Sequence, residues 1–334
     1  MGTSLEGKVA VVTGSGQGVG RGIAILLARE GAKVVTNNRK PRGGAAASTS
    51  FRSTALRDGV SFTAEEAAEY ARLHGDAAST AAEIVAGGGE AVPFFGDVND
   101  DEDAAALIQT AVDTFGRVDI LVNNAAGLGF GPFTSLTEED WAYQVRPKLD
   151  GAFHCMKHAV PRMLAQGSGR ILNTVSDAWV GIAALSAYSA ANAGLVGLTV
   201  ATAKELGRTG ITVNAFAPQA ESPGHVSFSA TLRTMLDAQG VVIDDEERMR
   251  ESEREHGPAE NLTFLAYLAS DDAADISGSV FTVTGGGRVS LYSEPVQVRT
   301  ITKDGAPWTV EELRAAVPTG LLDGYVAPAS RSEF

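Results

Sequence analysis

The chain has 334 residues, of which 44% are hydrophobic and 20% charged, and its formal net charge is −14. This composition is typical of a globular protein with a large core, and the negative charge argues against nucleic acid or an anionic membrane surface as partner. A single cysteine, Cys155, excludes an internal disulfide framework and predicts a reducing, cytoplasmic location. The sequence shows no signal-peptide pattern, no lipidation motif and no apolar run long enough to span a bilayer.

Short apolar runs alternate with amphipathic segments along most of the chain. Runs typical of strands occur at 8–13, 33–36, 91–95, 120–122, 170–174, 212–215 and 280–283. Helical spacing occurs between the earlier runs, at 21–30, 77–86 and 103–115. Continuously apolar strands that alternate with helices are typical of a parallel sheet covered on both faces. We therefore predict an α/β fold, a single-domain doubly wound (Rossmann-type) parallel sheet of about seven strands.

Two segments of the predicted domain, 1–334, lie outside this alternation. An added segment at about 43–74 contains a capping box at 63–66 (TAEE), which predicts the start of a short helix. A C-terminal extension at about 290–334 has a second capping box at 309–312 (TVEE). Because long ordered additions to a compact domain are usually functional, we expect one of them to cover the active-site mouth or a subunit contact.

A glycine-rich turn, TGSGQGVG at 13–20, follows the first strand. Its glycines allow a tight turn, approach of the backbone to a pyrophosphate and close helix packing, and the following helix start favours phosphate. The literal G-x-G-x-x-G spacing is absent, and a flexible turn is the alternative. The residues predicted to contact a dinucleotide are Gly14, Ser15, Gln17, Gly18, Val19 and Gly20.

Polar motifs follow further strands. NNAAG at 123–127 ends the fourth strand, Ser176 ends the fifth, and Tyr188 begins the next helix. All lie at carboxyl ends of parallel strands, where such sheets bind ligands. Together with the glycine-rich turn, GDV at 96–98 and ITVNAFAP at 211–218, these motifs resemble the short-chain dehydrogenase/reductase family. Within it, TVNAFAP at 212–218 and GSVFTVTGGGRVSLYSEP at 278–295 resemble the bacterial hydroxyacyl-CoA and hydroxysteroid dehydrogenases.

The resemblance spans roughly residues 5–290 and implies a nicotinamide cofactor lying across the strand ends. The family has proline–glycine after the sixth strand, and this sequence has Pro218 followed by Gln219. Beyond the glycine-rich turn, the positions that the resemblance assigns to the cofactor are Asn38, Arg39, Asp97, Val98, Asn123, Asn124, Ala125, Ala126, Gly127, Pro218 and Ser222.

Charge at the end of the second strand bears on the choice of cofactor. An acid there would bind the ribose 2′-OH of NAD(H) and repel the 2′-phosphate of NADP(H). The neutral Asn38 occupies this position, and Arg39, Lys40 and Arg42 follow it. Arginine can hold a phosphate with two hydrogen bonds, so we favour NADP(H) over NAD(H). The alternative is that these cations are solvated loop residues.

The catalytic groups that the resemblance implies are a serine, a tyrosine, a lysine and an asparagine. Ser176 would bind the substrate oxygen and Tyr188 would exchange a proton with it. The family's lysine, four residues after the tyrosine, is Asn192 here, and the family's asparagine is Lys148. Because a nearby cation lowers a tyrosine pKa by roughly 1–3 units, we expect Lys148 to supply the charge that Asn192 lacks. The alternative is that Lys148 points to solvent and the site is dead or repurposed.

The sequence thus predicts an NAD(P)(H)-dependent oxidoreductase that interconverts a ketone and a secondary alcohol. Apolar residues in the segment after the sixth strand, Phe228, Leu232, Met235 and Leu236, predict a fairly large apolar substrate. The alternatives are a non-redox enzyme of the same fold (dehydratase, epimerase or carbon–carbon lyase) and a cofactor-binding protein without catalysis. By resemblance we expect a homodimer or homotetramer. The pair His154 and His158 lacks an evident third ligand, so we predict no metal site.

Overall fold

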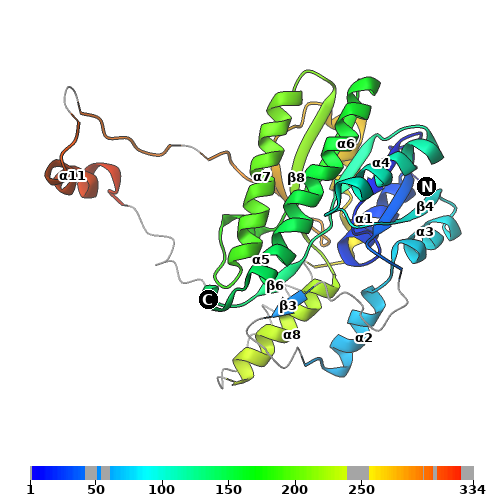
Figure 1. Cartoon of the computed structure of the whole chain (residues 1–334), viewed down its shortest axis with the longest axis horizontal. Coiled ribbons are helices and arrows are strands. Elements are labelled where there is room, and N and C mark those ends of the chain that lie inside the picture. The colour runs from blue at the N-terminus through cyan, green and yellow to red at the C-terminus, as the bar shows by residue number, and fades with distance from the viewer. Residues whose placement is uncertain are drawn as a thin grey trace. The chain divides into compact units, whose positions relative to one another are not determined.

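The computed structural model describes residues 2–41, 51–53, 61–238, 256–295, 297–303 and 307–324. Within these ranges eight strands form one sheet in the order β10-β9-β8-β7-β5-β1-β2-β4. Figure 1 shows helices around this sheet. The strands are β1 Val9–Val12, β2 Lys33–Asn38, β4 Ala91–Phe95, β5 Ile120–Asn123, β7 Gly169–Thr174, β8 Ile211–Gln219, β9 Val280–Thr284 and β10 Val289–Leu291. Neighbours are parallel except β10, which is antiparallel to β9. The predicted doubly wound sheet is confirmed, with the short edge strand β10 as an unpredicted addition.

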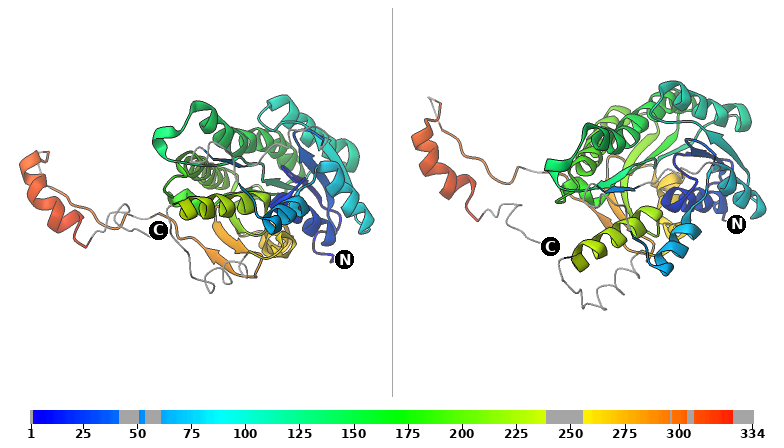
Figure 2. Two further views of the ribbon diagram at one scale, coloured as in Figure 1. Left: turned by 90° about the horizontal axis from the view of Figure 1, so that it is seen from below. Right: turned by 60° about the horizontal axis from the view of Figure 1, so that its bottom comes forward.

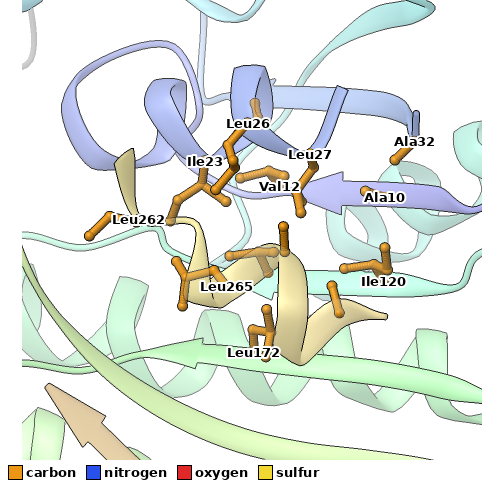
Figure 3. Packing of buried hydrophobic residues seen from close by; sticks show 14 of the residues in the cluster. Ala10, Val12, Ile23, Leu26, Leu27, Ala32, Ile120, Leu172, Leu262 and Leu265 are labelled. Atoms are coloured by element: carbon orange, nitrogen blue, oxygen red, sulfur yellow. The ribbon is translucent and has the colours of Figure 1, made fainter. Parts of the chain in front are cut away.

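One face of the sheet is covered by α1 (Gly18–Arg29), α3 (Ala77–Ala86) and α10 (Phe264–Ala269). Figure 3 shows this part of the core, where Ile23 of α1 and Leu265 of α10 are both fully buried. The apolar side chains of α1 thus pack on strands whose own residues are apolar on both faces, as expected of a parallel sheet.

The other face is covered by α4 (Asp101–Phe115), α6 (Gly151–Gln166) and α7 (Ser186–Leu206). Leu107 of α4 and Met163 of α6 are fully buried in this second cluster. The order of strands along the chain reverses between β1 and β5. The carboxyl ends of these two strands therefore flank the crevice where sheets of this type bind ligands.

The added segment predicted at about 43–74 lies partly outside the described residues. Its strand β3 (Phe51–Ser53) pairs in parallel with β6 (Leu128–Phe130), which follows the NNAAG motif. Its helix α2 (Ala64–Leu73) begins at the capping box predicted at 63–66, where both reciprocal hydrogen bonds are formed. The segment therefore adds a strand beside the loop that leaves β5.

Helix α2 lies beside α8 (Pro223–Ala238), as Figure 2 shows. Arg233 of α8 binds the carboxylate of Glu66 at 2.8 and 3.2 Å. Arg72 of α2 pairs with Glu221, just before α8, at 2.6 Å. The added segment is thus joined to elements that follow the carboxyl ends of two strands, β5 and β8.

Contacts divide the chain into two compact units, Met1–Tyr292 and Ser293–Phe334. In the second unit α11 (Val310–Ala316) begins at the capping box predicted at 309–312, and a π-helical turn, Val317–Leu321, follows. The large sheet belongs entirely to the first unit. In the part of the chain that the structure describes, no helix has the length and apolar character needed to cross a membrane.

Candidate functional site

Glycines shape the turn between β1 and α1. Gly14 and Gly18 have φ values of +62° and +49°, in the left-handed region that favours glycine. A Cβ on Gly14 would lie 3.0 Å from the Cα of Ala125. Helix α1 begins at Gly18, and the side chain of its N-cap residue, Gln17, caps none of the first amides. The turn therefore fits a pyrophosphate, which would accept hydrogen bonds from those amides.

Side-chain hydrogen bonds hold this turn to the sheet. The buried Ser15 donates from Oγ to the carbonyl of Val12 at 2.8 Å and accepts from the amide of Asn37 at 2.8 Å. Asn124 donates to the carbonyl of Thr13 at 3.1 Å. The backbone amide of Ser15 donates to the carbonyl of Asn37 at 2.9 Å. Both hydrogen-bond donors of Ser15 are therefore occupied within the protein, and neither is left for the predicted contact with a cofactor.

Asn37 is a residue of this site that the sequence analysis did not single out. Its Oδ1 accepts from the amide of Gly14 at 3.3 Å, and its Nδ2 donates to the carbonyl of Gly96 at 3.1 Å. The side chain is buried and so ties the glycine-rich turn to the end of β4. The available signal was a second asparagine, directly before Asn38, at the carboxyl end of the strand.

The end of β2 contains a buried acceptor and an exposed cation. Within the described residues the Oδ1 of Asn38 is buried without a hydrogen-bond partner, against Gly16. Such an atom is available to a ligand hydroxyl. Arg39 is exposed. Asp76 caps α3 beside the same glycine, and its carboxylate accepts from the amide of Ser79 at 2.8 Å.

The structure brings most of the other residues that were predicted to contact the cofactor to the same carboxyl edge of the sheet. Ser222 approaches the glycine-rich turn, since a Cβ on Gly18 would lie 3.1 Å from its Cβ, and its Oγ accepts from the amide of His225 at 3.1 Å. Asp97 is half-buried and Val98 is buried, one and two residues after Gly96. The side chain of Asn123 points inward instead, to Asn173, at 2.8 Å. The remaining predicted contacts near this edge are Val19, Gly20, Ala125, Ala126, Gly127 and Pro218.

Ser176 and Tyr188 form the centre of the candidate site. Ser176 follows β7 by two residues and caps the short 3-10 helix η3 (Asp177–Val180), and Tyr188 lies in the first turn of α7. Burial raises the pKa of Tyr188, and hydrogen bonds with the side chains of Ser176 and Asn192 lower it in part. A raised pKa keeps the phenol protonated at neutral pH, as a proton donor requires.

Lys148 is buried rather than pointing to solvent. It lies in a π-helical turn, η2 (Arg146–Asp150), and is 2% exposed. Its Nζ donates to the carbonyl of Thr174 at 2.8 Å, and burial lowers its pKa to about 7. Asn192 donates from Nδ2 to the carbonyl of Tyr188 at 2.8 Å, and its Oδ1 is buried with no partner among the described residues. The hydrogen bond of the Lys148 amine is therefore made to Thr174 and not to Tyr188.

The two histidines on α6 have separate partners. The Nδ1 of His154 lies 3.0 Å from the carbonyl oxygen of Val98, and the Nε2 of His158 lies 2.9 Å from the carboxylate of Asp101. Across the described ranges, no group of three His, Cys, Asp or Glu side chains could hold a metal ion. These histidines contribute to packing between α6, α4 and the end of β4.

The sequence and the fold are similar to those of known enzymes. A family model described as short chain dehydrogenase matches residues 63–227. The chain is 34% identical over 287 residues to the 3-oxoacyl-[acyl-carrier-protein] reductase of Synechocystis sp., covering 85% of this chain and 98% of that protein. It is 32% identical over 324 residues to the hydroxyacyl-CoA dehydrogenase ChsB1 of Mycobacterium tuberculosis, covering 94% and 89% of the two.

A solved structure agrees with these relatives. The crystal structure of a short chain dehydrogenase from Mycobacterium avium is 33% identical, with a TM-score of 0.72 and 97% of each chain covered. The chain therefore belongs to the short-chain dehydrogenase/reductase family. Its relatives place it among the NAD(P)(H)-dependent oxidoreductases of that family.

Proposed function

We propose that the protein interconverts a ketone and a secondary alcohol, with Tyr188 as proton donor and acceptor. The observation that supports this most strongly is the proximity of Ser176 and Tyr188 at the carboxyl edge of the sheet, where the Ser176 side chain lowers the pKa of the buried phenol in part. When bound, the nicotinamide supplies or accepts the hydride. Ser176 would hold the substrate oxygen by a hydrogen bond, and Tyr188 would deliver a proton to that oxygen in reduction or remove it in oxidation.

Lys148 is proposed to assist Tyr188 in this reaction. Its amine is buried beside the end of β7, bonded to Thr174, two residues before Ser176. The turn that contains it, η2, packs against α7, which bears Tyr188. When Tyr188 loses its proton, the negative phenolate would favour the protonated form of a nearby buried amine. The proposed role of Lys148 is to stabilise the phenolate that forms in the oxidation direction.

We propose an apolar substrate of considerable size. Phe130 of β6 and Phe228 of α8 meet edge to face with ring centroids 5.5 Å apart. Leu128 adjoins the start of α8, where a Cβ on Gly224 would lie 3.7 Å from it. These side chains form an apolar wall after the ends of β5 and β8. The further residues predicted to contact the substrate lie within α8: Leu232, Met235 and Leu236.

The names of two relatives suggest a class of substrate to assay first. One is a 3-oxoacyl-[acyl-carrier-protein] reductase and another a hydroxyacyl-CoA dehydrogenase. Both names describe acyl thioesters with oxygen on the acyl chain, which combine a reactive carbonyl or alcohol with an apolar tail. We therefore propose 3-oxoacyl or 3-hydroxyacyl thioesters as the first substrate class to assay.

The experiment that tests this function follows the nicotinamide absorbance during reduction of a series of 3-oxoacyl thioesters. Tyr188→Phe should lose about 100- to 10,000-fold in turnover, the usual contribution of general acid–base catalysis. Tyr267→Phe is a matched control, since Tyr267 is 43% exposed on α10. Wild-type turnover by Tyr188→Phe would contradict the assignment. Conversion of substrate without any change in nicotinamide absorbance would favour the non-redox alternative.

We propose NADP(H) as the preferred cofactor, because the exposed Arg39 follows a neutral residue, Asn38, at the end of β2. Asp76 lies nearby and would disfavour a 2′-phosphate, but its carboxylate is engaged in capping α3. Arg39→Ala should weaken NADPH far more than NADH, since a charge-assisted bond of about 1.5–3 kcal/mol is lost only with the phosphate. Calorimetric titration measures both affinities, with Lys204→Ala as a distant control. Equal weakening, or a wild type that prefers NADH, would overturn this choice.

We further propose that the protein acts in the cytoplasm as a homodimer or homotetramer on a small-molecule substrate, without nucleic acid or membrane partners. The buried free thiol of Cys155 supports a reducing environment, since no disulfide holds the fold. Light scattering in solution would test the assembly, and a monomer at micromolar concentration would contradict it.

A further inference from the structure

The residue after Ser176 is the centre of a polar cluster at the carboxyl edge of the sheet. One carboxylate oxygen of Asp177, Oδ1, accepts from the hydroxyl of Thr282 at 2.6 Å and from that of Tyr292 at 2.7 Å. The other, Oδ2, accepts from the Nε2 of Gln219 at 2.8 Å. The three donors come from β9, from the segment after β10 and from the end of β8. One carboxylate thus joins three distant parts of the chain to the first residue of η3.

Each of the three hydrogen-bond donors to Asp177 is itself fixed by its surroundings. Thr282 is 7% exposed and lies within the β9 ladder. The ring of Tyr292 packs edge to face on Trp179 of η3, with centroids 5.2 Å apart. Gln219 is the residue that stands where the family usually has glycine, so its side chain is an addition that this chain uses to bind Asp177. Fixed donors on both carboxylate oxygens leave the Asp177 side chain with one orientation.

This cluster constrains Ser176 from both sides. Before it, the amide of Val175 donates to the carbonyl of Phe216 at 2.7 Å, within the sheet. After it, Asp177 is anchored by its side chain, and the Oγ of Ser176 accepts from the amide of Ala178 at 3.2 Å. The backbone on either side of Ser176 is therefore fixed, and the bond from the Ala178 amide orients the hydroxyl of Ser176, whose side chain lowers the pKa of Tyr188.

We propose that Asp177 is a positioning residue that acts through Ser176, holding the serine hydroxyl where it meets both Tyr188 and the substrate oxygen. The inference rests on the proposed role of Ser176 in the reaction. The proposal also gives a role to Gln219, which stands where the family pattern has glycine and whose side chain binds Asp177. A displacement of about 1 Å at a reacting group can cost on the order of a hundredfold in rate, so the anchoring has a measurable effect.

The test removes two of the donors and keeps the carboxylate. Thr282→Val and Tyr292→Phe retain shape, so the double variant leaves the core filled while Oδ1 of Asp177 loses both partners. We expect kcat with a 3-oxoacyl thioester to fall about ten- to hundredfold, with cofactor affinity unchanged. Thr282→Ser keeps the hydroxyl and should retain wild-type turnover, and Tyr267→Phe controls for loss of a tyrosine hydroxyl.

A double-mutant cycle separates positioning from general stability. In a Ser176→Ala background the same double variant should lose less than about twofold further, because the side chain it positions is gone. A full additional loss in that background would overturn the inference while leaving the proposed function standing. Undiminished turnover by Ser176→Ala itself would overturn the proposed function and the inference together.

A second measurement does not depend on any substrate. Hydrogen exchange of the amides in η3 should become at least about tenfold faster in the double variant, since the helix loses its anchor, while exchange in α1 and α4 stays unchanged. Unchanged protection of η3 would overturn the proposal, because Asp177 would then not fix the backbone beside Ser176.

Discussion

Single residues would set the chemistry proposed for this site. By the resemblance to the family, Asn192 stands at its lysine position and Lys148 at its asparagine position, and the proposed role of Lys148 depends on this exchange. The sequence predicts the exchange, because both positions lie in stretches that resemble the family's. It could not show that the Lys148 amine is buried and bonded to Thr174, since that depends on a π-helical turn and on a strand 26 residues away in sequence.

The burial of Lys148 has a consequence for stability. Its pKa in the folded protein, about 7, lies below its ordinary value of 10.5. Between these two pH values the unfolded chain therefore binds more protons than the folded chain, and this group makes the fold more stable as pH rises. Below about pH 7 the Lys148 amine is charged in both the folded and the unfolded chain. The folded chain then bears the full free-energy cost of burying that charge.

We predict that Lys148→Met becomes more stable relative to wild type as pH falls. The difference in unfolding free energy should change by about 1.4 kcal/mol per pH unit between pH 7 and 9 and level off below pH 7. Urea denaturation across this range measures it, with the exposed Lys204→Met as control. A difference that does not vary with pH would show that the Lys148 amine is not perturbed by its surroundings.

At the scale of elements, long periodic segments were predictable and short ones were not. Seven of the sheet strands follow from apolar runs, and both capping boxes begin helices as predicted. The strands β3, β6 and β10 have three residues each, too few for a two-residue alternation to stand out. Their pairing depends on partners distant in the chain. The side chain of Asn37 likewise binds partners distant in the chain, Gly14 and Gly96, so the sequence did not single it out. Ser176 and Tyr188 were found because they lie in recognisable motifs.

The loop between η3 and α7 contains backbone strain. Ala184 has a φ of 62°, and its carbonyl accepts from the amide of Gly131 at 2.9 Å. The left-handed conformation costs a residue with a Cβ roughly 1–2 kcal/mol. Part of this strain can be relieved by glycine, at the cost of greater freedom in the unfolded chain.

We predict that Ala184→Gly stabilises the protein by about 0.5–1 kcal/mol, the strain relieved minus the unfolded-state entropy. Ala190→Gly, at an exposed position inside α7, is the matched control and should destabilise by about 1 kcal/mol. Urea denaturation of the two variants measures both effects. Equal destabilisation by both substitutions would mean that Ala184 is not strained.

At the scale of the whole molecule, the chain consists of the family's sheet and a second unit that begins at Ser293. The second unit leaves large apolar side chains in solvent, with Val298 84% and Val310 69% exposed. Exposed apolar groups of this kind are typical of surfaces that become covered in an assembly. This is the physical basis for expecting the extension to have a role in assembly or at the active site.

We predict that a chain ending at Tyr292 keeps its fold but differs from the full chain in oligomeric state or in turnover. Tyr292 has to be retained, because it binds Asp177. Circular dichroism, light scattering and steady-state assays of the two chains would decide. A shortened chain with the same assembly, stability and turnover would show that the extension serves neither purpose.

The central claim is that Lys148 takes over the part of the family's missing lysine, and the pH dependence of turnover tests it most directly. If protonated Lys148 lowers the pKa of the Tyr188 phenol by roughly 1–3 units, its loss should slow alcohol oxidation about ten- to a thousandfold. We predict this loss, with an upward shift of the pH–rate profile, for both Lys148→Met and Lys148→Asn. Combining Lys148→Asn with Asn192→Lys should recover part of the rate. Wild-type rates and an unmoved profile in Lys148→Met would contradict the claim and show that the exchange is coincidental.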